Sequence, residues 1–169
     1  LLVLALLAAS TVLAQRPQTR QGFWIGFGFG YGSAKFSCTG CTGGSRQDGV
    51  AGFLKLGGTL RPNLLLGGEF DGWTKDESGV TVSLGNASAA LYWYPSVAGG
   101  FFAKGGLGTS TYSASAGNTS VSKTGLGLLT GLGYDIRIGS NTSLTPVADF
   151  IFGSQGDINF VNVFTIPGA

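Results

Sequence analysis

The residues with the clearest chemical potential in this sequence are two cysteines three positions apart, Cys38 and Cys41. A Cys-x-x-Cys pair can act as a redox dithiol, but such a dithiol sits in a βαβ setting, usually at the start of a helix. The pair can also supply half of a zinc site, which a second pair or histidines must complete. The sequence has no further cysteine and no histidine. If the chain is exported, a local disulfide is the favoured interpretation; a metal-bound or reactive pair and two unpaired thiols are the alternatives.

The absence of histidine also narrows the catalytic chemistry that the chain can carry out. Near neutral pH a serine hydroxyl or a water molecule needs a general base before it attacks a substrate. The Gly-x-Gly stretches are not a nucleotide fingerprint, because no helix opens within them. No basic run is interleaved with stacking aromatic residues, as nucleic-acid binding requires. We therefore predict a protein that is not an enzyme, with no catalytic residue, cofactor, metal ion or nucleic-acid partner.

Charged residues make up only 11% of the sequence, and their positions follow a pattern. A hairpin centred on Pro62 places Lys55 opposite Glu69 and Phe53 opposite Asp71. A cross-strand charge pair is stabilising, and in a dry interior an ion is retained only with its partner, so loss of Lys55 should strand Glu69. The alternative is a solvated pair on a soluble sheet. Alternation adds charges from later strands, and the predicted interior network is Lys55, Glu69, Asp71, Lys104, Asp135, Arg137 and Asp149.

The stretch that must position these charges is Gly22 to Gly32, GFWIGFGFGYG. Its alternate residues form one bulky apolar face and one face of glycines with Trp24, which is the pattern of a β-strand. A soluble sheet would carry polar residues opposite its apolar face. No helical periodicity after Ala14 could cover that face. We therefore predict that the bulky face meets lipid and that the glycines line a narrow barrel.

Eight alternating runs of this kind fill the chain. The predicted strands are 22–32, 49–60, 64–73, 80–94, 100–109, 123–137, 142–153 and 158–166. Segments rich in Ser, Gly and Thr predict long loops, and turn residues predict short connections. The long loops are 33–48 and 110–122, and the short connections include 74–79, 95–99 and 138–141.

Two details of the fourth run lead to separate predictions. Its alternation changes face, which predicts a β-bulge near Gly85 and Asn86. Trp93 and Tyr94 stand next to a proline and are predicted to lie in the aromatic girdle at one membrane interface. Whether Trp24 lies in the aromatic girdle or in the lumen stays open.

Residues 1–14 form a segment distinct from the barrel pattern. The apolar run from Leu1 to Ala9 is too short to span a bilayer, and small residues precede Gln15 at positions that signal peptidase prefers. We predict an export signal at 1–14 that lacks its charged start, a polar lead-in at 15–21 and one barrel domain at 22–169. A buried N-terminal helix is the alternative.

The stretches GFWIGFGFGYG, GFLKLGGTL, LYWYP, GGFFAKGGLG and TGLGYDIRIGSNTSLTP resemble bacterial outer-membrane β-barrel domain proteins of the OmpA/OmpX type. The resemblance covers about residues 22–153. It implies an all-β fold: an eight-stranded, antiparallel, up-and-down transmembrane barrel in the bacterial outer membrane, exported through a Sec-type signal peptide. It also implies lipid and the barrel insertion machinery as partners, and a monomer. The family's last strand closes on an aromatic residue, whereas this sequence ends Ile-Pro-Gly-Ala, so we predict an incomplete last strand.

Together these observations predict a non-enzymatic outer-membrane barrel with a structural or surface-binding role. Its lumen would be filled by side chains, because eight strands leave little room inside. The alternative function is that of a small barrel carrier, or of a narrow channel for an apolar or small solute.

Overall fold

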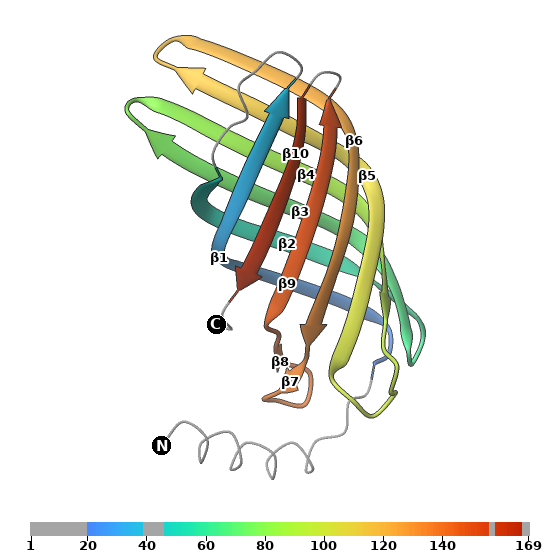
Figure 1. The fold of residues 1–169 in the computed structure, drawn as a ribbon. Helices are drawn as coiled ribbons and strands as arrows, with labels where there is room; N and C mark the ends of the chain where they lie inside the picture. The colour runs from blue at the N-terminus through green and yellow to red at the C-terminus, as the bar shows by residue number, and fades with distance from the viewer. Residues whose placement is uncertain (1–19, 39–45, 156–157, 167–169) are drawn as a thin grey trace, which may run out of the picture.

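The computed structural model describes residues 20–38, 46–155 and 158–166. These residues form the strands β1 (Phe23–Cys38), β2 (Gln47–Arg61), β3 (Leu64–Glu77), β4 (Val80–Trp93), β5 (Phe101–Ala116), β6 (Thr119–Tyr134), β7 (Ile136–Arg137), β8 (Ser143–Leu144), β9 (Val147–Gln155) and β10 (Ile158–Ile166). Eight of these strands form a closed barrel in the order β1-β10-β9-β6-β5-β4-β3-β2 (Figure 1). The predicted eight-stranded, antiparallel, up-and-down fold is confirmed. Nowhere in the described chain is there a helix long and apolar enough to cross a membrane.

The alternation of β1 determines which side chains face outward and which face the lumen. Phe23, Ile25, Phe27, Phe29 and Tyr31 all point outward and are 65–80% exposed. The glycines between them face side chains inside the barrel. A Cβ atom added to Gly28 would lie 2.7 Å from the Phe53 ring, and one added to Gly26 would lie 2.9 Å from the Lys55 side chain. Small residues therefore make room for the bulky residues of the neighbouring strand in a narrow lumen.

The register of the β2–β3 hairpin is as predicted, whereas the predicted bulge in the fourth strand is wrong. Lys55 pairs with Glu69, and Phe53 pairs with Asp71. β4 pairs with β3 and β5 over its whole length without a register shift. Leu84 is buried and Val82 packs against the core, so the inward face of β4 becomes apolar toward one end of the barrel. In the sequence, this switch from polar to apolar residues on one face has the same pattern as a shift of the apolar residues to the opposite face.

Several strands extend beyond their predicted ends. β3 continues to Glu77 through most of the predicted connection 74–79, and Ser- and Thr-rich segments expected to form loops are strands. β5 and β6 continue through most of the predicted loop 110–122 and turn near Gly117, whose φ of 55° suits glycine. Hydroxyl pairs join the two strands, with 3.1 Å between Thr111 and Thr124 and 3.2 Å between Ser113 and Ser122. Cross-strand hydroxyl contacts of this kind stabilise a sheet. The β3–β4 and β5–β6 hairpins project from the top of the barrel in Figure 1.

The opposite end of the barrel carries three short connections, and we call it the short-turn end. They join β2 to β3, β4 to β5 and β6 to β9; the last contains the small β7–β8 sheet. The predicted sixth strand thus ends at Tyr134 rather than Arg137, and the seventh is divided at Pro146. The predicted short connections at 95–99 and 138–141 are confirmed. Trp93 is 51% exposed on the outer wall near this end, which agrees with a girdle position.

The last barrel strand, β10, pairs with β9 along its full length. It pairs with β1 only at Tyr31–Cys38. The remaining edge of β1, Phe23–Gly30, has no partner strand on that side within the described chain. The export signal at 1–14 lies outside the described residues, as do most of the lead-in, Cys41 with its proposed disulfide to Cys38, and the C-terminal residues 167–169.

Candidate functional site

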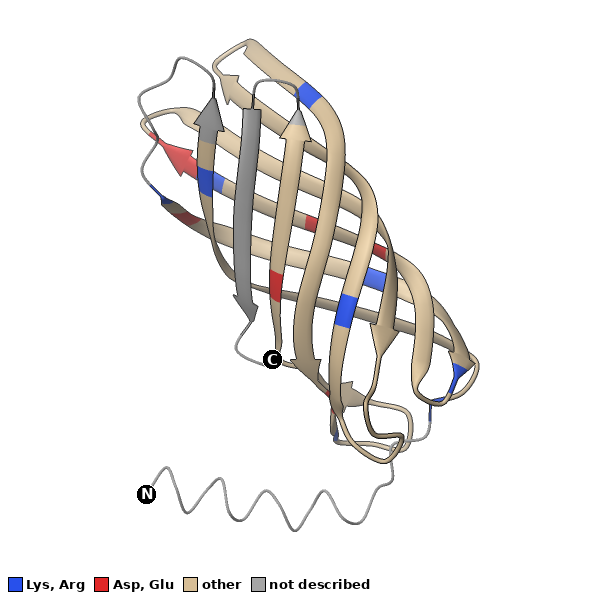
Figure 2. Cartoon of the chain, turned by 45° about the vertical axis from the view of Figure 1, so that its right-hand side comes forward, with Lys and Arg blue, Asp and Glu red and all other residues tan. Residues whose placement is uncertain are grey.

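The centre of the lumen is occupied by a cation held between two carboxylates. Lys104 extends inward from β5, and its ammonium contacts the carboxylate of Glu69 on β3 and that of Asp149 on β9, the latter at 2.8 Å. The exposed fractions are 4% for Lys104 and 0% for both acids. Tyr92 on β4 donates its hydroxyl to Glu69 Oε2 at 2.5 Å. Four strands therefore meet at one buried ionic group, whose charged positions are coloured in Figure 2.

Lys55 lies beside this group but is bound differently from the prediction. Although it pairs with Glu69 in the hairpin register, its ammonium lies over three aromatic rings, 5.3 Å from the centre of Phe53, 5.5 Å from Tyr92 and 5.2 Å from Phe102. Such cation–π contacts are favourable within about 6 Å. The ion-pair partner of Glu69 is Lys104, which reaches it across the lumen. In a barrel this narrow, a long side chain on the opposite wall competes for a carboxylate with the residue that faces this carboxylate in the hairpin.

Above the ionic group, toward the hairpin end, the lumen becomes less polar. Asn86 on β4 donates its Nδ2 group to Asp71 Oδ2 at 3.2 Å and to Ser88 at 2.8 Å. Beyond them, Trp73 packs near Phe36, which in turn packs against Tyr112, with ring centroids 6.2 and 5.6 Å apart. Trp73 also donates its indole N–H to Gly32 O at 3.0 Å. The lumen thus contains an ionic layer and, above it, an aromatic layer.

The short-turn end is organised around Arg20, which lies near the end of the predicted lead-in 15–21. Arg20 is 7% exposed; it donates to Val97 O at 3.1 Å and to Gly99 O at 2.6 Å. Its guanidinium lies 3.5 Å from the centre of the Tyr94 ring. Tyr94 is 4% exposed and points inward, so its predicted place in the girdle is wrong. Burial, followed by the charge of Asp135, raises the pKa of the Tyr94 phenol, which therefore keeps its proton.

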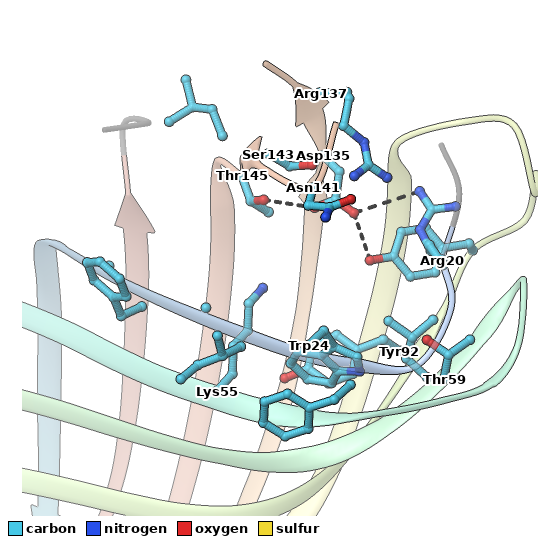
Figure 3. Close-up of a pocket in the computed structure, with 18 of the residues that line it drawn as sticks. Arg20, Trp24, Lys55, Thr59, Tyr92, Asp135, Arg137, Asn141, Ser143 and Thr145 are labelled. Atoms are coloured by element: carbon cyan, nitrogen blue, oxygen red, sulfur yellow. Dashed lines mark hydrogen bonds and ion pairs between the residues drawn. The ribbon is translucent and has the colours of Figure 1, made fainter. Parts of the chain in front are cut away.

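Asp135 and Arg137 lie at this end and not among the barrel-strand charges (Figure 3). Asp135 accepts hydrogen bonds from Tyr94 at 2.9 Å and Thr145 at 2.8 Å, and its carboxylate is 3.7 Å from Arg20. Arg137 donates to Ser140 O at 3.2 Å. The predicted network therefore divides in space into the group around Lys104 and a group below it. Arg20 joins the lower group by a contact that no local pattern in the sequence indicates.

The carboxylates of Glu69, Asp71 and Asp149 offer oxygens within 4.8 Å of one another, a spacing compatible with metal ligands. However, the Lys104 ammonium already contacts two of these acids and neutralises part of their charge. Tyr92 and Asn86, which bind the acids, were missed in the sequence. The inward direction of Asn86 follows from unbroken alternation along β4, and the mistaken bulge concealed it.

Comparisons with known proteins agree with this architecture. The model of the family described as outer membrane protein beta-barrel domain matches residues 2–162. No curated protein gives a significant match to the sequence. The chain is similar to the crystal structure of Ail, the attachment invasion locus protein of Yersinia pestis, at 17% identity and a TM-score of 0.65, covering 86% of this chain and 95% of Ail. It is also similar to Neisserial surface protein A, at 16% identity and a TM-score of 0.57, covering 85% of this chain and 94% of that protein.

Proposed function

This chain belongs to the family of outer membrane protein β-barrel domains, and from that premise we propose that it is a non-enzymatic barrel with a closed lumen and a structural or surface-binding role. Membership of this family places it in the bacterial outer membrane. We further propose that it is a monomer surrounded by lipid and inserted by the barrel insertion machinery. A disulfide between Cys38 and Cys41 remains a prediction, favoured by export to an oxidising compartment.

The closed lumen is supported by two layers of side chains, one ionic and one apolar, that lie one above the other inside the narrow barrel. Lys104, Glu69 and Asp149 fill the ionic layer and are almost entirely buried. Trp73 and Leu84, which are 2% and 4% exposed, belong to the apolar layer above it. An ion crossing the barrel would have to break the first layer and enter the second without water, which is costly. These layers therefore support a barrel that does not conduct.

Planar-bilayer recording tests the closed lumen directly. We expect the folded protein, inserted from detergent, to leave the bilayer conductance at its baseline, because the aromatic layer excludes water from the pore. A general porin added to the same bilayer serves as the positive control, and heat-modifiable gel migration shows that the protein was folded. Reproducible conductance steps from the folded protein would instead favour the narrow channel.

The surface role is supported by the hairpins, which extend the barrel wall beyond the length that a membrane requires. A transmembrane strand needs about 9–11 residues, whereas β5 and β6 have 16 residues each. In outer-membrane barrels the longer connections face outside the cell and the short turns face the periplasm. We therefore propose that the β5–β6 hairpin is displayed on the cell surface. Its Ser and Thr side chains, together with Lys123, form a nearly uncharged surface. A surface with so few cations favours a neutral target over a polyanion.

Insertion of a peptide epitope tests this display. A tag between Gly117 and Asn118, at the turn of the β5–β6 hairpin, should be detected by antibody on intact cells, because turn tips tolerate insertion and this tip lies far from the barrel. The matched control carries the same tag between Pro62 and Asn63, at the short-turn end, and should be detected only after the outer membrane is permeabilised. Detection of the second tag, but not of the first, on intact cells would reverse the proposed orientation.

A further inference from the structure

The residues that precede β1 turn away from the barrel wall at the short-turn end. Gly22 has a φ of 74°, in the left-handed region that favours glycine, and a Cβ atom added there would meet nothing within 4 Å. The backbone conformation, rather than the available space, therefore requires glycine at this position. Gly22 O still accepts a hydrogen bond from Thr59 N on β2 at 2.9 Å. The chain before Gly22 thus leaves the wall at the opening of the barrel, which we call the mouth.

Arg20 reaches the wall that lies opposite β1. In the closed barrel, three strands separate β5 from β1 on either side. The Arg20 guanidinium nevertheless donates to Val97 O at 3.1 Å and to Gly99 O at 2.6 Å, both in the turn that leads into β5. It also lies 3.5 Å from the centre of the Tyr94 ring and 3.7 Å from the carboxylate of Asp135 (Figure 3). Arg20 is therefore bound across the mouth, and it is only 7% exposed there.

The wall that receives Arg20 is held together by contacts of its own. Asp135 N donates to Gly100 O at 2.9 Å, which joins the connection after β6 to the turn before β5. The Asp135 carboxylate accepts hydrogen bonds from Tyr94 at 2.9 Å and from Thr145 at 2.8 Å. Loss of Arg20 would leave these donors in place, so the carboxylate would keep hydrogen-bond partners. The receiving wall therefore does not depend on Arg20 for its structure.

We propose that residues 20–22 form a strap that closes the mouth, and that this strap opens while the barrel stays folded. Arg20 fastens the strap, and Gly22 is its hinge. Opening breaks the contacts of the Arg20 side chain but none of the strand pairs of β1, which begin at Phe23. Arg20 and Trp24 both line the cavity at this end, so an open strap would admit solutes from water to Trp24. This closure is separate from the ionic and aromatic layers, which lie further inside the lumen.

Spin labelling of the full chain in lipid vesicles tests how the strap is fastened. The label is attached at Gln21→Cys, an exposed position, in a Cys38→Ser and Cys41→Ser background. We expect an immobilised spectrum with Arg20 present, because the strap is held at both ends. Arg20→Gln should raise the ratio of mobile to immobilised label about tenfold or more, as expected for the loss of a charged hydrogen bond. The matched control is Arg61→Gln, which removes an exposed arginine at the end of β2 and should leave the spectrum unchanged.

Quenching of tryptophan fluorescence by acrylamide tests whether the strap closes the mouth. A Trp93→Phe background removes the tryptophan on the outer wall, and Trp24→Phe identifies the signal from the cavity. Trp73 is 2% exposed and lies beyond the ionic layer, so its signal should stay constant. Arg20→Gln should increase the Stern–Volmer constant of Trp24, because acrylamide, which is soluble in water, then reaches the cavity. Bilayer conductance should stay at its baseline in the same variant, since both inner layers remain closed.

Heat-modifiable gel migration shows whether each variant is folded. Loss of this migration in Arg20→Gln would overturn the proposal, because the strap would then be part of the barrel fold. A mobile label with Arg20 in place would also overturn it, as would an immobilised label in folded Arg20→Gln. A mobile label combined with unchanged quenching of Trp24 would show that the strap does not close the mouth. Conductance steps that appear only in Arg20→Gln would support the strap and contradict the closure by the inner layers.

Discussion

Replacing Lys104 with methionine is expected to lower the free energy of unfolding by about 3–5 kcal/mol, the cost of leaving a buried ion pair without one partner. Methionine keeps the length and most of the volume of the side chain, so the loss reports on charge rather than on a cavity. Glu69 and Asp149, which are both fully buried, would lose their shared cation. Urea unfolding from lipid vesicles, followed by tryptophan fluorescence, measures the change.

Two further variants separate this ionic group from the cross-strand pair that the sequence predicts. Lys55→Ala should cost clearly less than Lys104→Met, because Glu69 keeps its contacts with Lys104 and Tyr92. Adding Glu69→Gln and Asp149→Asn to Lys104→Met should restore part of the lost stability, since no uncompensated charge remains at the centre. A Lys55→Ala variant less stable than Lys104→Met would show that the hairpin pair is the principal interaction of Glu69.

Replacing Leu107 with arginine is expected to lower the free energy of unfolding by about 2–4 kcal/mol, the cost of placing this cation at the bilayer midplane on the lipid face of a barrel. Leu107 is 63% exposed and lies seven positions into β5 from the short-turn end. A membrane-spanning strand needs about 9–11 residues. Leu107 is therefore close to the middle of the apolar band, where an exposed leucine is stable only if its solvent is hydrocarbon.

Val121→Arg is the matched control for this substitution. Val121 is 54% exposed on β6, near the turn of the β5–β6 hairpin and beyond the expected membrane boundary. Its replacement should change the free energy of unfolding by no more than about 0.5 kcal/mol, as for most surface positions. Unfolding in lipid vesicles compares the two variants. Equal, small effects at both positions would mean that Leu107 does not contact hydrocarbon.

The sequence predicts those structural features that depend on neighbouring residues along one strand. The alternation of Phe23 to Tyr31 with glycines predicts the strand and its outward face, and the turn at Pro62 predicts that Lys55 faces Glu69. Both follow from the period of two in a β-strand, and the structure has both. The same reasoning is wrong at the fourth strand. There, polarity changes along one inward face, and alternation alone cannot distinguish this change from a bulge.

The sequence by itself determined the class of fold, the number of barrel strands and the direction of most side chains, because these depend on local alternation and on short turns. Only the tertiary structure decided which charges meet. Lys104, Glu69 and Asp149 come from three strands, and Arg20 reaches Asp135 from the opposite end of the chain. The physical reason is closure of the barrel, which brings distant strands within one side-chain length across a narrow lumen. There a long cation contacts the nearest buried carboxylate, whatever its distance along the chain.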